Sequence, residues 1–144
     1  MAKRSEAKLD ADLVAKIIAK CESIPIFHTL GFHTPVFESG VCTATVPYNK
    51  QYDGVFESFH GGILMTIADS IACCALMTLT GPDEPMATTD MNIRFLARCV
   101  GDVTAKATVI KCGRTLCPIH VDLHDAEGKH IAVSQVTYIR LGAG

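Results

Sequence analysis

The sequence contains no tryptophan, and aromatic residues make up only 6% of its 144 residues. It also lacks a basic block, because its 13 lysines and arginines are scattered among 15 acidic residues and leave a net charge of −2. Proteins that bind nucleic acid or anionic membrane surfaces need a concentrated basic region. The composition therefore argues against nucleic acid and membrane as partners.

The N-terminal stretch MAKRSEAKLDADLV has no apolar segment, so secretion is not expected. The seven cysteines are an odd number at irregular spacing, which does not suggest a disulfide framework. Reduced thiols are typical of a cytoplasmic protein, so a cytoplasmic location is expected.

What the chain does have is a long apolar run, Gly61 to Thr80, whose single ionisable side chain is Asp69. The run is long enough for a membrane span, but acidic residues flank it where Lys or Arg anchors would be expected. An acid in the middle of a bilayer is rare. A helix buried inside the protein is the better interpretation.

The rest of the pattern predicts one α+β domain over residues 1–144. A first helix is expected over about residues 10–22, capped by Asp10. Pro25 and Gly31 break the helical pattern, and two strands follow around a turn at residues 38–40.

After the apolar helix, the sequence TGPDEP ends the helical pattern, and four alternating segments predict consecutive antiparallel strands. Strict alternation in the first of them places Met91 and Ile93 on one face and Thr88 on the other. A bulge is expected near Ser134 in the last strand. A curved antiparallel sheet wrapped around the apolar helix would cover both elements.

The sequence His-Gly-Gly at residues 60–62 opens the apolar helix, an acid follows nine positions after the histidine, and TTDMNI comes next. With the order of elements, this resembles the hotdog-fold acyl-CoA thioesterases, in particular the phenylacetate-degradation and 4-hydroxybenzoyl-CoA thioesterase-like enzymes. The resemblance covers about residues 24–141. It implies hydrolysis of an aryl- or medium-chain acyl-CoA in a homodimer or homotetramer, with no cofactor besides the coenzyme A of the substrate.

Gly61 and Asp69 are the main candidates for catalysis. The first turn of a helix offers unpaired N–H groups, and a glycine there lets a carbonyl approach, so Gly61 is the candidate oxyanion donor. Its alternative role is a tight packing contact. Asp69 is the candidate base or nucleophile, and its alternative is a structural acid bonded to the backbone or a threonine.

Two further residues come from the resemblance. His60 is expected to shape the start of the helix near the thioester, with a capping or packing histidine as the alternative. Thr88 is expected to position water or Asp69, although a shift of one residue would exchange it with Thr89. Gly62 completes the glycine pair as a weaker candidate for substrate binding.

Helix geometry adds an inference about assembly. Eight residues separate Gly61 from Asp69, a rise of about 12 Å. One thioester carbon cannot lie within reach of both groups on the same helix. If both act on one substrate, they come from different subunits of a symmetric oligomer.

The sequence departs from the family pattern in the loop before the histidine, where Gly54 replaces a common Asn and Glu57 replaces a usual Gly. Glu57 is either a solvated loop residue or a second acid at the site. The altered loop keeps open a protein that binds acyl-CoA or an acyl chain without hydrolysis. A dehydratase or hydratase is disfavoured, because no histidine pairs clearly with the acid.

Weak candidates for the coenzyme A phosphates are Arg94, Arg98, Lys111 and Arg114, each of which is otherwise an ordinary solvated charge.

Two other patterns are weak. Zinc-like spacing occurs at Cys112, Cys117, His120 and His124, but a strand would point Cys117 away from the histidines, so no metal is expected. Cys73 and Cys74 have no histidine at helical spacing, which disfavours a cysteine nucleophile.

Overall fold

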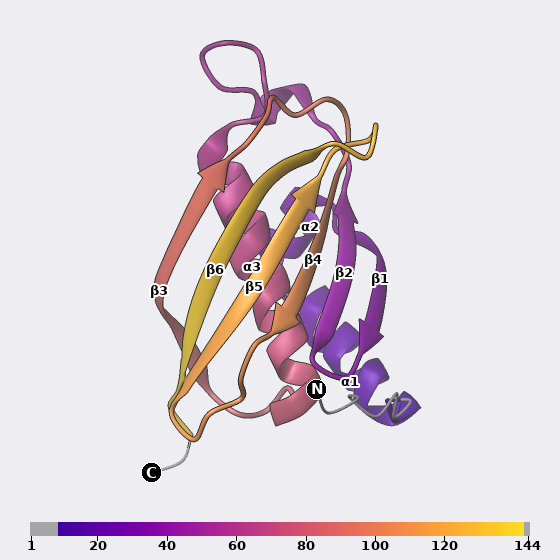
Figure 1. Cartoon of the computed structure of the whole chain (residues 1–144). Helices are drawn as coiled ribbons and strands as arrows, with labels where there is room; N and C mark the ends of the chain where they lie inside the picture. Colours follow the sequence, from indigo (N-terminus) through magenta and orange to yellow (C-terminus); the bar gives the residue numbers. More distant parts are fainter. Residues whose placement is uncertain (1–8, 143–144) are drawn as a thin grey trace.

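A computed structural model describes residues 9–142 of the chain. Six antiparallel strands, in the order β1-β2-β4-β5-β6-β3, curve around one long helix, α3 (Figure 1). The strands are β1 (His33–Glu38), β2 (Val41–Val46), β3 (Met86–Phe95), β4 (Val103–Val109), β5 (Leu116–His124) and β6 (His130–Arg140). This confirms the α+β class and the curved sheet around a central helix.

Helix α3 (Gly61–Thr80) is apolar because the sheet and the N-terminal helices enclose most of it. By length and composition it could cross a membrane, but 56% of its most apolar 18-residue window is buried inside the fold. Its buried residues are Leu64, Ile67, Ala68, Ile71, Ala72, Cys74, Ala75, Leu76, Met77 and Thr78. The helix is therefore the centre of the hydrophobic core, as predicted.

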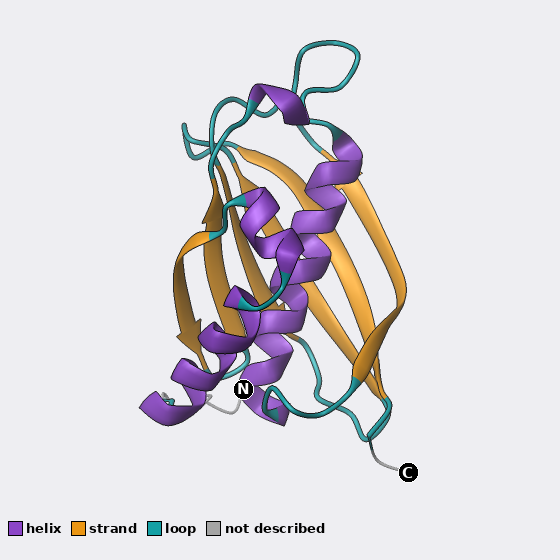
Figure 2. Ribbon diagram, turned by 180° about the vertical axis from the view of Figure 1, so that it is seen from behind, coloured by secondary structure: helices purple, strands orange, loops and turns teal. Residues whose placement is uncertain are grey.

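Two helices precede the sheet and lie against α3 on the side of β1 and β2 (Figure 2). Helix α1 (Ala11–Glu22) is capped as predicted, because the Asp10 carboxylate accepts a hydrogen bond from the Asp12 N–H at 2.9 Å. Helix α2 (Pro25–Leu30) was not predicted. Pro25 is its first residue and Gly31, at φ 70°, is its left-handed C-cap, so both residues bound a short helix.

The bulge predicted near Ser134 lies three residues earlier in β6. Leu123 of β5 pairs with Ala132 and His124 pairs with His130, so Ile131 is an extra residue, while the register at Ser134 itself is continuous.

A second irregularity, which was not predicted, lies in β3 between Thr88 and Asp90, where Thr89 is an extra residue. An extra residue reverses the side-chain alternation on one side of it. Thr88 therefore faces α3 together with Met91, which corrects the predicted placement of Thr88 on the opposite face.

A 3-10 turn, η1 (Lys50–Tyr52), interrupts the loop between β2 and α3. The described elements share one hydrophobic core. The prediction of one domain over residues 1–144 also included residues 1–8 and 143–144, which lie outside the described residues.

Candidate active site

The start of α3 has one amide that the fold leaves unused. His60 is the N-cap, and its Nδ1 accepts a hydrogen bond from the Gly62 N–H at 2.9 Å. The His60 carbonyl accepts from the N–H groups of Ile63 and Leu64, at 3.0 and 3.1 Å. No residue in the described part of the chain accepts a hydrogen bond from the Gly61 N–H. This amide lies at the positive end of the α3 dipole and is available to an oxyanion.

Both glycines are closely packed against aromatic rings. A Cβ at Gly61 would lie 2.9 Å from Cζ of Phe95, and a Cβ at Gly62 would lie 3.1 Å from Nδ1 of His60. The packing role considered for Gly61 is therefore present, together with the unused amide. The His60 ring caps the helix, and because its Nδ1 accepts, the proton of the neutral ring is on Nε2.

Asp69 lies eight residues further along α3 and is half-buried. Its Oδ1 accepts hydrogen bonds from Oγ1 of Thr88 at 2.7 Å and from Oη of Tyr138 at 2.9 Å. Among residues 9–142, none donates a hydrogen bond to Oδ2. One carboxylate oxygen is thus fixed by two hydroxyls, and the other can take a proton from water or attack a carbonyl carbon.

Tyr138 is the site residue that sequence reasoning missed. It lies on β6, its ring is 6% exposed, and its hydroxyl also contacts the Asp69 carbonyl oxygen at 3.0 Å. Burial raises the pKa of Tyr138 well above its usual value, so the hydroxyl stays protonated and donates. The available signal was a tyrosine on the buried face of the last strand, because a buried tyrosine hydroxyl needs a partner.

The neighbouring thiol does not compete with Asp69 as a nucleophile. Burial raises the pKa of Cys73 to about 11, so Cys73 is a neutral thiol near neutral pH. Asp69 is accordingly the stronger candidate for a reactive group in this part of α3.

Replacement of Tyr138 by phenylalanine is expected to lower kcat about tenfold, because Asp69 loses one of its two side-chain hydrogen bonds. KM should stay nearly unchanged, since the hydroxyl holds the carboxylate and is not expected to bind the substrate. Steady-state kinetics of Tyr138→Phe would separate the two parameters. A rise in KM at constant kcat would contradict this positioning role, and urea unfolding would check that the variant folds.

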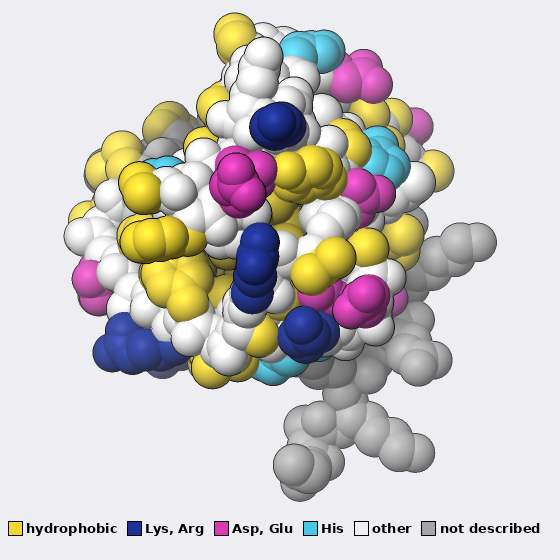
Figure 3. All heavy atoms as spheres, turned by 90° about the horizontal axis from the view of Figure 1, so that it is seen from above, with side chains coloured by type: hydrophobic (Ala, Val, Ile, Leu, Met, Phe, Trp, Pro, Cys, Tyr) yellow, Lys and Arg dark blue, Asp and Glu magenta, His cyan; other side chains and the backbone are white. Residues whose placement is uncertain are grey.

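The loop before His60 also lies at this end of α3. The Arg98 guanidinium donates to the Glu57 carbonyl oxygen at 2.9 Å, and the Glu57 side chain is exposed. A Cβ at Gly54 would lie 3.6 Å from Cδ2 of His60, so Gly54 lies beside the ring. Arg94 is exposed near the end of β3. Figure 3 shows this end of the molecule, where apolar patches are separated by single basic and acidic side chains.

Arg114 does not join this group. It follows Gly113, whose carbonyl accepts from Arg140 at 3.1 Å, and Arg140 pairs with Glu84 just after the end of α3. Lys111 lies at the same end, in a hollow beside the last turn of the helix. A 20-residue helix is about 30 Å long, so both cations are far from the Gly61 end of their own chain.

The zinc-like residues do not converge either. Cys117 is buried inside the sheet, whereas His120 and His124 alternate onto its other face. Nε2 of His120 pairs with the Asp122 carboxylate at 2.9 Å. Within residues 9–142, no group of three His, Cys, Asp or Glu side chains is arranged to hold a metal ion.

Comparison with known proteins places this geometry in a family. Residues 56–132, more than half of the chain, match the profile of the Thioesterase superfamily. Acyl-coenzyme A thioesterase 13 of Mus musculus is 33% identical over 103 residues, which cover 69% of this chain and 71% of that protein.

Two solved structures share the fold. The PaaI protein of the E. coli phenylacetic acid degradation operon has a TM-score of 0.83 at 20% identity, covering 94% of this chain and 97% of that one. A thioesterase from Haemophilus influenzae has a TM-score of 0.76 at 27% identity, covering 85% of each chain.

These matches identify a hotdog-fold thioester hydrolase. The chain belongs to the thioesterase superfamily, which confirms the resemblance drawn from the sequence.

Proposed function

We propose that this protein hydrolyses the thioester of an aryl- or medium-chain acyl-CoA, using Asp69 of one subunit and Gly61 of another. The observation that carries this proposal is the pair of unused groups on α3. The Gly61 N–H has no acceptor within the described chain, and Oδ2 of Asp69 has no donor there. The first suits an oxyanion and the second suits a water or a carbonyl carbon.

In the proposed reaction, the thioester carbonyl oxygen approaches the Gly61 N–H at the positive end of α3. Asp69 either removes a proton from an attacking water or attacks the thioester carbon itself. Negative charge develops on the carbonyl oxygen and is stabilised by the amide. On the water route, collapse of the tetrahedral species breaks the carbon–sulfur bond, Asp69 returns the proton to the sulfur, and coenzyme A leaves as the thiol beside the free acid. On the direct route, collapse leaves a mixed anhydride on Asp69 and a thiolate that takes a proton from solvent, and water then hydrolyses the anhydride to the free acid and the Asp69 carboxylate.

The proposal needs two subunits, since Gly61 and Asp69 are about 12 Å apart along one helix. Two features support an assembly through this side of the fold. Strand β3 is a ten-residue edge strand with an unpaired side, which invites pairing with a second copy. Asp69 lies on the incompletely buried face of α3, together with Met65 and Cys73. A homodimer or a homotetramer built from such dimers would carry paired sites.

The substrate class rests on the relatives and on the surroundings of Asp69. One relative is an acyl-coenzyme A thioesterase, and one structural neighbour comes from a phenylacetic acid degradation operon. Met86, Met91 and Ile93 are partly buried and apolar on the α3-facing side of β3, which suits an acyl group. Arg94 and Arg98 lie at the Gly61 end, where they could meet the coenzyme A phosphates. The free thiols fit a cytoplasmic location.

The test is release of free thiol from a panel of aryl, medium-chain and long-chain acyl-CoAs. We expect turnover to be fastest with aryl or medium-chain substrates and to saturate with concentration. Measurable binding without thiol release would overturn the hydrolytic proposal and favour an acyl-CoA-binding protein.

Mixing two inactive variants tests the shared site. Asp69→Asn and Gly61→Pro subunits, unfolded together and refolded, should recover about a quarter of wild-type activity. Random pairing makes half of the dimers mixed, and each mixed dimer has one intact site of two. Each variant refolded alone is the control. A mixture that stays as inactive as its components would show that both groups act within one chain.

A further inference from the structure

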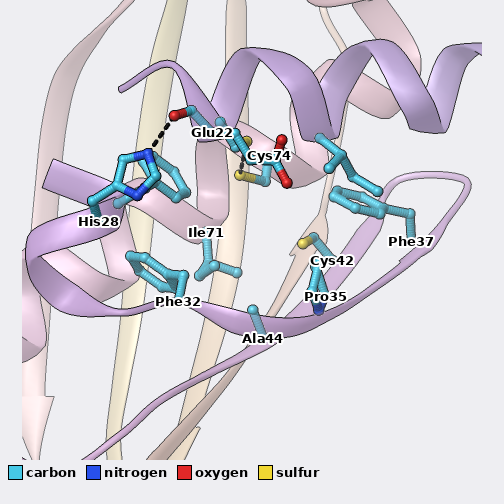
Figure 4. A pocket seen from close by; sticks show the side chains of 12 residues that line it. Glu22, His28, Phe32, Pro35, Phe37, Cys42, Ala44, Ile71 and Cys74 are labelled. Carbon is cyan, nitrogen blue, oxygen red and sulfur yellow. Dashed lines mark hydrogen bonds between the residues drawn. The ribbon is translucent and has the colours of Figure 1, made fainter. Parts of the chain in front are cut away.

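A cavity of about 150 Å³ lies beneath the N-terminal helices, between α1, α2, β1, β2 and α3 (Figure 4). Its floor is formed by buried side chains, among them Ala44 of β2 and Ile71 of α3. Glu22 and His28, both exposed, border its mouth. The cavity therefore has an apolar interior and an opening toward solvent.

This cavity is separate from the candidate active site. Strands β1 and β2 form one edge of the sheet, whereas β3, which carries Thr88, forms the other. None of His60, Gly61, Asp69 or Tyr138 lines the cavity. Helix α3 lies between the two places, so an acyl group bound at Asp69 would not extend into the cavity of the same chain.

The walls favour an aromatic ring. Phe27 and Phe32 form a tilted pair with ring centroids 4.8 Å apart, and Phe37 adds a third ring. Tilted and edge-to-face contacts are the geometry that aromatic rings prefer with one another. A cavity of this volume is large enough for benzene, which an apolar protein cavity of about 150 Å³ can bind.

Three thiols complete the wall, those of Cys21, Cys42 and Cys74. Sγ of Cys21 lies 3.5 Å from Sγ of Cys74, and this hydrogen bond together with burial raises the pKa of the Cys21 thiol. The Cys21 thiol is therefore neutral, and soft sulfur atoms pack well against aromatic edges.

The charges at the mouth exclude an anion. No Lys or Arg lines the cavity, and the only ionisable groups besides the thiols are Glu22 and His28. The His28 ring is already hydrogen-bonded to the Glu22 carbonyl oxygen (Figure 4). A carboxylate would enter without a cation and beside another carboxylate, so the acid released by thioester hydrolysis does not fit.

The geometry points to a second binding site in this cavity, specific for a small, uncharged aromatic molecule of about the size of benzene. The site does not depend on the proposed catalytic roles of Gly61 and Asp69.

Fluorobenzene is a suitable probe, because its binding can be followed by ¹⁹F NMR. We expect saturable binding to the wild-type protein, with NOEs from the ring to the methyl groups of Ile18 and Ile71. The charged comparator 4-fluorobenzoate should bind at least about tenfold more weakly. Unsaturable binding, equal binding of the two probes, or NOEs only to Met91 and Ile93 would overturn the assignment.

A filling variant provides the matched control. Ala44→Leu places extra carbons on the cavity floor and should weaken fluorobenzene binding at least about tenfold, with thioester hydrolysis retained. Thr43→Leu adds similar bulk to the other face of β2 and should bind like wild type. Undiminished binding by a folded Ala44→Leu protein would refute the site. If Ala44→Leu does not fold, the wild-type NOEs decide, and unchanged binding in Asp69→Asn separates this site from the active site.

Discussion

Asp69→Asn is expected to lower kcat for thioester hydrolysis by about 10²- to 10⁴-fold, the range that a positioned acid or base contributes. The amide oxygen of Asn can still accept the hydrogen bonds from Thr88 and Tyr138, so the side chain keeps its place. The neutral amide cannot take a proton from water or form an acyl intermediate as a carboxylate does. Free-thiol release at saturating acyl-CoA measures the loss.

The matched control is Asp90→Asn, an exposed acid on β3 beyond the bulge. It should retain wild-type turnover, because Asp90 does not share the α3-facing side with Thr88. An Asp69→Asn protein within about tenfold of wild type would rule out a catalytic carboxylate. Mass spectrometry of the protein quenched during a single turnover then distinguishes the two routes, since only direct attack adds the acyl group to the Asp69 peptide.

Gly61→Pro is expected to lower kcat by about 10²- to 10³-fold, because proline removes one donor from the oxyanion site. The backbone conformation at this position already suits proline. Gly61 is the first residue of α3, where proline is favoured, and its N–H makes no hydrogen bond within the described residues. His60 already has φ −60° and ψ 130°, the conformation that a residue before proline adopts.

Gly61→Ala is the control for the added side chain. Alanine and proline both place a Cβ against the Phe95 ring, but alanine keeps the N–H. The ring is 53% exposed and can move aside, so both variants should fold. The ratio of their kcat values therefore reports the amide alone. Equal rates for the two variants would show that the Gly61 N–H is not the oxyanion donor.

The long elements were predictable because their signals are local. The helical stripe of α1, the apolar run of α3 and the alternation of the strands all lie within single segments of the sequence. Asp69 attracted attention for the same reason, as the one charge in an apolar run. Helix α2 was missed because six residues are too few for a periodic pattern, and its Pro and Gly suggested a break.

The environment of Asp69 could not be predicted in this way. Its contact with Tyr138 joins residues 69 positions apart, and only the order of strands in the sheet brings them together. Its contact with Thr88 depends on the extra residue in β3, whereas strict alternation pointed Thr88 away. The register of the strands thus decides which hydroxyls contact Asp69. A hydrophobic pattern predicts that register only where no bulge interrupts it.

The bulge in β3 decides which of two neighbouring threonines faces Asp69. Thr88 and Thr89 are consecutive and identical, and regular pairing without the bulge would turn Thr89 toward α3 in place of Thr88. Either arrangement presents the same hydroxyl and methyl group to Asp69. A mutation elsewhere in the sheet that removed the bulge would therefore keep a threonine beside Asp69, but it would turn Met86 away from α3. The repeated threonine thus preserves the hydroxyl partner of Asp69 in either register, whereas the apolar surroundings contributed by Met86 depend on the bulge.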